Sequence, residues 1–149
     1  MRKAWLLLAA LAVATTAQAQ LPGLRKRGPA PPAVPVMVGI DALRADFMAH
    51  SGANTVYFGG DSAILSAPAK ATLGAQAQWL LQHPAVVVRV EGHAEPSDTR
   101  DHALAVGARR AQEVRDYLVL LGVPAAQLSM TTWGKERPGP GRAVTVLVR

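Results

Sequence analysis

The stretch AVVVRVEGHAEPSDTRDHALAVGARRAQEVRDYLVLLG, residues 85–122, decides the fold. It begins with a near-continuous run of β-branched residues, which is typical of a buried strand. A polar loop follows. Apolar residues then recur every three or four positions up to Gly122, which predicts an amphipathic helix that ends there. The stretch therefore predicts a strand, a loop at its carboxyl end, and a long helix packed on the sheet.

Two adjacent arginines, Arg109 and Arg110, interrupt this helix. On a helical wheel of 100° per residue, Arg109 lies about 170° from the centre of the apolar stripe, and Arg110 lies about 70° from it. We expect Arg109 to point into water and Arg110 to hold its guanidinium at the rim of the sheet. A held guanidinium can clamp a carboxylate, although a border residue in a structural ion pair is the alternative. The stripe consists of Leu104, Gly107, Ala111, Val114, Leu118 and Leu121.

Cap and turn signals predict the other elements of the chain. Residues 41–50 form a short helix, 54–60 a strand, and 66–84 a helix with Ser66 as its N-cap. Residues 127–134 and 142–149 form the last two strands. The predicted order is β-α-β-α-β-β. It indicates an α+β fold with two helices packed on one face of a small mixed sheet. The stripe of the 66–84 helix contains Leu73, Ala77, Leu80 and Leu81.

The first 36 residues have a different composition from the rest. Residues 1–19 carry a basic start, a short apolar run and an A-x-A site, which together predict a cleaved export signal. Residues 20–36 are rich in proline and predict an extended linker, so the domain is expected at 37–149. The chain has no cysteine, so neither a disulfide nor a lipid on an N-terminal cysteine is expected. These features predict an exported, periplasmic protein.

The formal net charge of +6 comes mostly from the N-terminal segments. From residue 36 onward, 11 basic residues face 10 acidic ones. This balance gives no broad basic surface, so we expect no nucleic-acid partner. The predicted mature chain holds no transmembrane segment.

The loop after the buried strand is the predicted binding site. Ligands gather outside the carboxyl ends of strands in open α/β sheets, and a helix N-terminus nearby favours an anion. We therefore expect Glu95 in this loop and Arg110 in the helix to face each other across a small cleft. A carboxylate and a guanidinium together suit a zwitterion, with an ammonium and a carboxylate on one carbon.

Residues 90–138 resemble the OmpA-like peptidoglycan-binding domain family, closest to the peptidoglycan-associated lipoprotein type but without a lipobox cysteine, and the resemblance extends over about residues 45–149. The resemblance rests on GHAE at 92–95, LAVGARRAQEV at 104–114, YLVLLGV at 117–123 and GKERP at 134–138. It implies binding of the diaminopimelate side chain of peptidoglycan stem peptides. The family's arginine then falls on Arg110 and its aspartate on Glu95.

The sequence also departs from the family pattern. Glu95 is one methylene longer than the family's aspartate, and Gly59-Gly60 replace a different pair after the first strand. The connection after GKERP is short, and Arg142 alone remains of a terminal N-R-R motif. We count Arg142 as a ligand-binding candidate on that basis. Asp61 is the fourth candidate, with a turn role as its alternative.

The expected function is non-catalytic binding of peptidoglycan, contributing to envelope integrity, in the periplasm or associated with the outer membrane. The alternative is a degenerate module of the same fold that contacts another envelope protein. An enzyme is not expected. His93, Glu95 and His102 lack the spacing of a zinc site, and no metal or other cofactor is expected.

Overall fold

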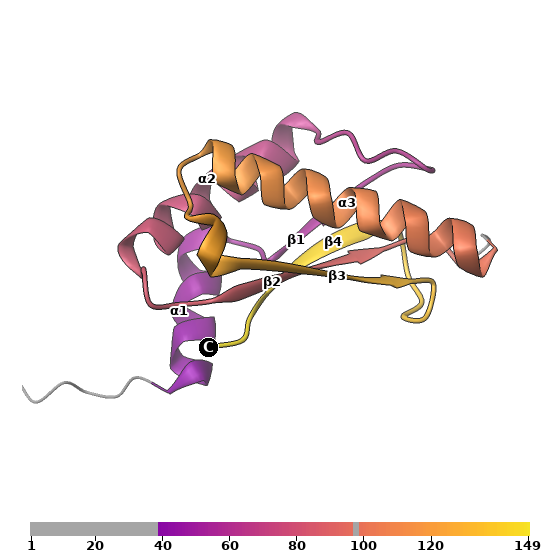
Figure 1. Ribbon diagram of the computed structural model, residues 1–149. Coiled ribbons are helices and arrows are strands. Elements are labelled where there is room, and N and C mark those ends of the chain that lie inside the picture. The colour runs from indigo at the N-terminus through magenta and orange to yellow at the C-terminus, as the bar shows by residue number, and fades with distance from the viewer. Residues whose placement is uncertain (1–38, 97–98) are drawn as a thin grey trace, which may run out of the picture. The chain divides into compact units, whose positions relative to one another are not determined.

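The computed structural model describes residues 39–96 and 99–149, which form three helices and a four-stranded mixed sheet (Figure 1). The predicted export signal and linker, residues 1–36, lie outside the described residues. Within the part of the chain that is described, no helix is both long and apolar enough to cross a bilayer. The elements are α1 (Ile40–Ser51), β1 (Thr55–Tyr57), α2 (Ala67–Gln82), β2 (Val88–His93), α3 (Arg100–Leu120), a 3₁₀ turn η1 (Ala125–Gln127), β3 (Leu128–Gly134) and β4 (Arg142–Leu147).

The helix boundaries follow the predicted caps. The Ser66 hydroxyl accepts the backbone N–H of Ala69 at 3.3 Å at the start of α2, and the helix ends just before Pro84. Thr99 caps α3 in the same way by accepting the N–H of His102 at 3.3 Å. Each hydroxyl satisfies a donor that the first helical turn leaves without a partner. The α2 prediction is therefore confirmed.

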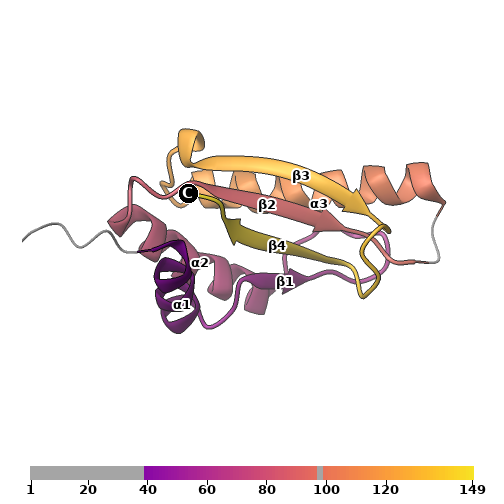
Figure 2. The same ribbon diagram turned by 90° about the horizontal axis from the view of Figure 1, so that it is seen from below.

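The sheet has the strand order β1-β4-β2-β3. Strands β2 and β3 are parallel, and β4 runs antiparallel to both β1 and β2. Helices α2 and α3 cover one face of the sheet, as predicted (Figures 1 and 2). Because β1 and β2 both run against β4, their carboxyl ends lie where β4 begins. Arg142 accordingly pairs with Tyr57 on one side and with His93 on the other.

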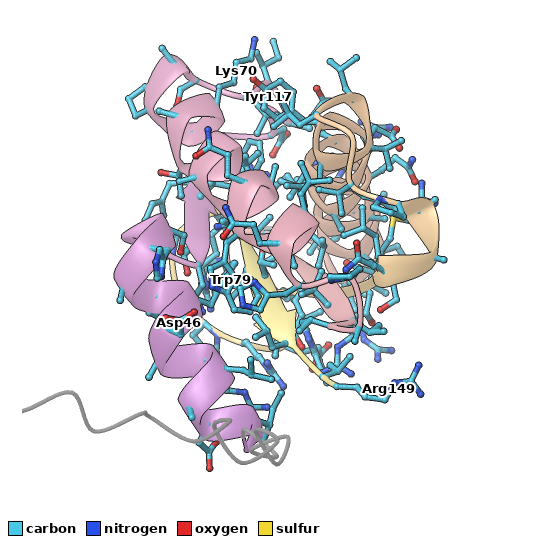
Figure 3. The ribbon with its side chains drawn as sticks, turned by 90° about the vertical axis from the view of Figure 1, so that its left-hand side faces the viewer. Asp46, Lys70, Trp79, Tyr117 and Arg149 are labelled. Atoms are coloured by element: carbon cyan, nitrogen blue, oxygen red, sulfur yellow. The ribbon has the colours of Figure 1, made fainter. Side chains whose placement is uncertain are left out.

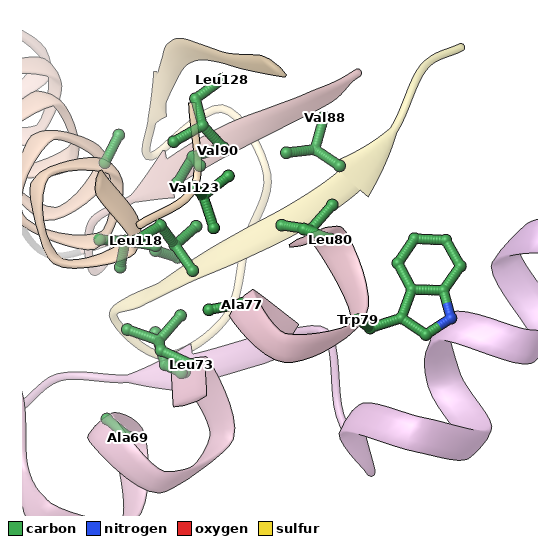
Figure 4. Packing of buried hydrophobic residues seen from close by; sticks show 14 of the residues in the cluster. Ala69, Leu73, Ala77, Trp79, Leu80, Val88, Val90, Leu118, Val123 and Leu128 are labelled. Carbon is green, nitrogen blue, oxygen red and sulfur yellow. The ribbon is translucent and has the colours of Figure 1, made fainter. Parts of the chain in front are cut away.

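The core lies between these two helices and the sheet (Figure 4). Leu73 and Leu80 of α2 belong to the same buried cluster as Val88 and Val90 of β2, and all four are fully buried, as is Leu118 of α3. Burying one such side chain contributes about 1.5–3 kcal/mol. The apolar stripe predicted for α3 therefore faces the sheet, as the periodicity of the sequence indicates.

Helix α1 forms over the predicted short helical segment and packs on α2. The Trp79 indole N–H donates to the Asp46 carboxylate at 2.7 Å, and its ring meets Phe47 edge-on. Figure 3 labels Trp79 and Asp46 where the two helices meet. This contact extends the buried face of α2 toward Trp79. Leu81, which the sequence places in the apolar stripe, lies on the other side of α2 and is 48% exposed, so that part of the prediction is wrong.

Candidate functional site

The four predicted site residues lie at the end of the sheet where β1 and β2 finish and β4 begins. Asp61 follows β1, Glu95 follows β2, and Arg142 opens β4. Arg110 reaches this end from the middle of α3, because its guanidinium donates to the last residue of β2. The topology therefore gathers residues from four separate segments of the sequence.

Arg110 is fully buried and its guanidinium is held by backbone carbonyls. Nε donates to the Ser62 oxygen at 2.9 Å, and Nη1 donates to the His93 oxygen at 2.8 Å. Nη2 donates to the Gly60 oxygen. The guanidinium also lies 5.3 Å from the centre of the Phe58 ring. One cation thus ties α3 to the end of β2 and to the loop between β1 and α2.

This burial corrects the expectation that the Arg110 guanidinium sits at the rim. The wheel placed the side chain at the border of the helix, but it could not include the β1–α2 loop that covers it. The short connection between β3 and β4 closes the other side, since a Cβ at Gly141 would collide with the guanidinium. Arg109 is exposed, as predicted.

Asp61 ties the covering loop to the start of α3. Its carboxylate lies 3.1 Å from Nε2 of His102, and both side chains are largely exposed. Such a surface pair adds little stability by itself. It does place the Asp61 carboxylate beside the first turn of α3, so Asp61 contacts this helix as well as following the turn at Gly60.

Glu95 lies just beyond β2 and is partly exposed. The Ala94 N–H before it donates to the Gly134 oxygen at 2.8 Å, which fixes the backbone next to the site. Arg142 is also partly exposed, and its Nη1 donates to the Pro140 oxygen at 3.1 Å. Glu95 and Arg142 therefore keep part of their side chains accessible near the buried Arg110, as the largely exposed Asp61 does.

A second polar cluster beside the site was missed by the sequence analysis. Glu91 is 3% exposed and pairs with Arg89 at 2.9 Å and with Arg137 at 2.8 Å. Arg137 lies 3.9 Å from the centre of the Trp133 ring. The signal was the alternation of Arg89, Glu91 and His93 along one face of the strand. The distant Arg137 could not be assigned from that pattern.

His93 is buried in the same cluster, with 1% exposure. Neither ring nitrogen has a hydrogen-bond partner among the described residues. Burial first, and then the positive charge of Arg142, lower the pKa of His93 to about 4, and the negative charge of Glu91 opposes this shift. The imidazole is therefore uncharged at pH 7, and it fills the space between the charged groups without adding a charge to the cluster.

Known proteins are similar to this chain in both sequence and fold. Residues 57–144 match the OmpA family. The peptidoglycan-associated lipoprotein of Rhizobium meliloti (strain 1021) is 45% identical over 93 residues, which cover 62% of this chain and 52% of that protein. The lipoprotein of the same name from Pseudomonas aeruginosa is 40% identical over 99 residues, covering 66% and 58%. The chain spans about half the length of such relatives.

Solved structures agree with this result. The peptidoglycan-associated lipoprotein from Burkholderia pseudomallei superposes with a TM-score of 0.63 at 33% identity, over 65% of this chain and 92% of that one. The C-terminal domain of Helicobacter pylori MotB gives a TM-score of 0.56 at 18% identity, over 65% and 84%, and shows the shared fold alone. The matched segment contains the ends of β1 and β2, all of α3 and the start of β4, so the chain belongs to the OmpA family.

Proposed function

We propose that this chain binds peptidoglycan in the cell envelope and does so without catalysis. Its relatives at 40–45% identity are named for their association with peptidoglycan. The observation that carries the proposal is the buried guanidinium of Arg110, held at the end of the sheet by three backbone carbonyls of the β1–α2 loop and of β2. A guanidinium fixed at this place can donate charge-assisted hydrogen bonds to an anionic ligand.

The ligand group that fits best is the zwitterionic end of a diaminopimelate side chain. Its carboxylate would meet Arg110, and its ammonium would meet the partly exposed carboxylate of Glu95. Arg142 would add a second cation on the β4 side. The opposite charges on Glu95 and Arg110 match a group that carries both charges on one carbon, and a lysine side chain lacks the carboxylate.

A direct contact with Arg110 requires the β1–α2 loop to shift, because the Gly60 and Ser62 carbonyls occupy two of its donors. A Cβ at Gly59 or Gly60 would meet nothing within 4 Å, so no neighbouring side chain or backbone lies against that side of the loop and blocks its shift. A ligand carboxylate would replace the two carbonyls as the acceptor of charge-assisted hydrogen bonds.

The same enclosure favours the second candidate function, a module that contacts another envelope protein. Gly141 of the short β3–β4 connection lies against the Arg110 guanidinium and narrows the approach to it. If the loop does not open, the role of Arg110 is to hold the loop and β2 together. The accessible charges of Glu95 and Arg142 would then contact the surface of another envelope protein.

Co-sedimentation with purified sacculi separates the two. The chain without residues 1–19 should sediment with diaminopimelate-type sacculi and remain in solution with lysine-type sacculi. Glu95→Lys should abolish sedimentation, although it adds positive charge that favours the anionic sacculus. Glu113→Lys, on the exposed face of α3, makes the same charge change and should sediment like the original chain. Absence of sedimentation for the original chain would leave the protein-binding module as the function.

A further inference from the structure

Strand β3 forms one edge of the sheet, with β2 as its neighbour on the inner side. Its seven residues, LSMTTWG, include no charged residue and no proline. Edge strands usually carry such residues, or are very short, to prevent pairing with another chain. The opposite edge, β1, is only three residues long. Strand β3 therefore carries neither a charge nor a proline along this edge, and the shift in its register with β2, between Thr132 and Gly134, lies near its carboxyl end.

Helix α3 lies over the seam between β2 and β3. Gly107 packs so closely on Gly92 of β2 that a Cβ on either residue would collide with the other's backbone. On the β3 side, the Thr132 hydroxyl donates to the Leu104 oxygen at 3.1 Å. Figure 2 shows α3 running behind these two strands along their length. The axis of α3 therefore lies over a line midway between β2 and β3, roughly 2.4 Å from β3 toward the inside of the sheet, which is half the spacing between strands.

The surface between α3 and the β3 edge is apolar and hollowed. A cavity of about 200 Å³ opens there, lined by small or uncharged side chains. Met130 lines this cavity and is 45% exposed, an unusual exposure for a side chain on the helix-covered face. The lining residues are Ala108, Ala111, Met130, Thr131 and Thr132.

We propose that two copies of this chain pair along this edge, β3 antiparallel to β3, about a two-fold axis that passes near Met130 and Ala108. The pairing would join the two sheets into one of eight strands. Adjacent strands are about 4.8 Å apart, so the two copies of α3 would lie about 10 Å apart, the distance at which helices pack. Ala108, a small residue on both copies, stands at the crossing.

The charges on α3 favour a second copy as the occupant. Asp101 and Arg115 lie seven residues before and after Ala108, on the same side of the helix. In an antiparallel pair centred on Ala108, Asp101 of each copy would face Arg115 of the other. Asp101 is exposed, and Arg115 contacts only the adjacent Asp116 among the ion pairs of the described residues. A self-complementary surface of this kind is what a two-fold interface requires.

Sedimentation equilibrium of the chain without residues 1–19 tests the charge pair. The original chain should dimerise, and Asp101→Lys or Arg115→Glu should each raise the dissociation constant about tenfold. The double variant should return close to the original value, because the pair is restored with its signs exchanged. Asp41→Lys, which makes the same charge change as Asp101→Lys on the exposed side of α1, should have no effect. A monomer at every concentration, or a double variant as weak as the two single variants combined, would overturn the proposal.

A cross-linking experiment tests the axis itself. The chain has no cysteine, so Ala108→Cys introduces a single thiol at the proposed crossing. Mild oxidation should convert this variant to a disulfide-linked dimer. Gln78→Cys, exposed on α2, should remain largely monomeric under the same conditions. Equal yields from the two variants would mean that the dimer, if it forms, uses another surface.

Discussion

Arg110 donates from Nη1 to the backbone oxygen of His93 at 2.8 Å, and this bond joins the middle of α3 to the last residue of β2. Two further nitrogens of the same guanidinium hold the β1–α2 loop. The residue that the family resemblance marks for ligand binding is therefore also a structural tie. A loss of binding in an Arg110 variant has to be separated from a loss of folding.

Arg110→Ala should lower the free energy of unfolding by about 3 kcal/mol, because it leaves the carbonyls of Gly60, Ser62 and His93 without their donor. Arg110→Lys should recover little, since an ammonium cannot reach three diverging oxygens. Urea denaturation measures both. Arg109→Ala is the control, and its midpoint should stay near that of the original chain. Equal effects of the Arg109 and Arg110 variants would contradict the assigned contacts.

Gly141→Ala should destabilise the protein by about 1–3 kcal/mol. The new methyl group would overlap the Arg110 guanidinium, which cannot withdraw without giving up a hydrogen bond. Gly59→Ala is the matched control, because a Cβ there meets nothing within 4 Å. Thermal unfolding of the two variants should separate them clearly. A Gly141→Ala variant as stable as Gly59→Ala would show that Gly141 does not lie in close contact with the Arg110 guanidinium.

Two helical glycines should respond to alanine with opposite signs. Gly74→Ala in α2 should raise stability by about 0.5–1 kcal/mol, since its Cβ would lie in open space and alanine favours helix. Gly107→Ala in α3 should lower stability, because its Cβ would meet the Thr132 hydroxyl and lie 2.9 Å from the Gly92 oxygen. Denaturant titration gives both signs in one experiment.

Sequence patterns predicted the features that depend on neighbouring residues. The cap at Ser66, the end of α2 before Pro84 and the face of α3 all follow from spacings within one helix. The features that were missed depend on distant segments. Arg110 is buried by carbonyls 48 and 50 positions away, and Glu91 is paired with an arginine 46 positions away. The hydrophobic periodicity of a segment predicts which of its own residues share a face, and it gives no information about contacts with distant segments.

The stability of the protein should fall as the pH drops from about 6.5 toward 4. The pKa of His93 is lowered to about 4 in the folded state, against an ordinary value of 6.5. Below pH 6.5 the unfolded chain therefore binds a proton that the folded protein excludes. The free energy of unfolding should decrease by up to about 1.4 kcal/mol per pH unit from this group, and the contribution is complete above pH 6.5.

Urea titrations at pH 7, 6 and 5 check this dependence. His93→Leu removes the titrating ring from the buried site and should flatten the profile relative to the original chain. Gln78→Leu, a similar change of a polar side chain to leucine at an exposed position without a titrating group, is the control and should leave the slope unchanged. If the His93→Leu profile is as steep as that of the original chain, carboxylates rather than His93 account for the acid sensitivity.

Glu95 offers the cleanest test of ligand binding, because its side chain is partly exposed and its changes should not disturb the fold. Glu95→Gln keeps the shape and removes the charge, so the affinity for a diaminopimelate muropeptide should fall about tenfold as the ligand ammonium loses its partner. Glu95→Asp restores the shorter acid of the family and should hold or raise the affinity. Calorimetric titration measures each, with a lysine-type muropeptide as the control ligand. Equal affinities of all three chains for both muropeptides would remove Glu95 from the site and leave the contact with another envelope protein as the function of this surface.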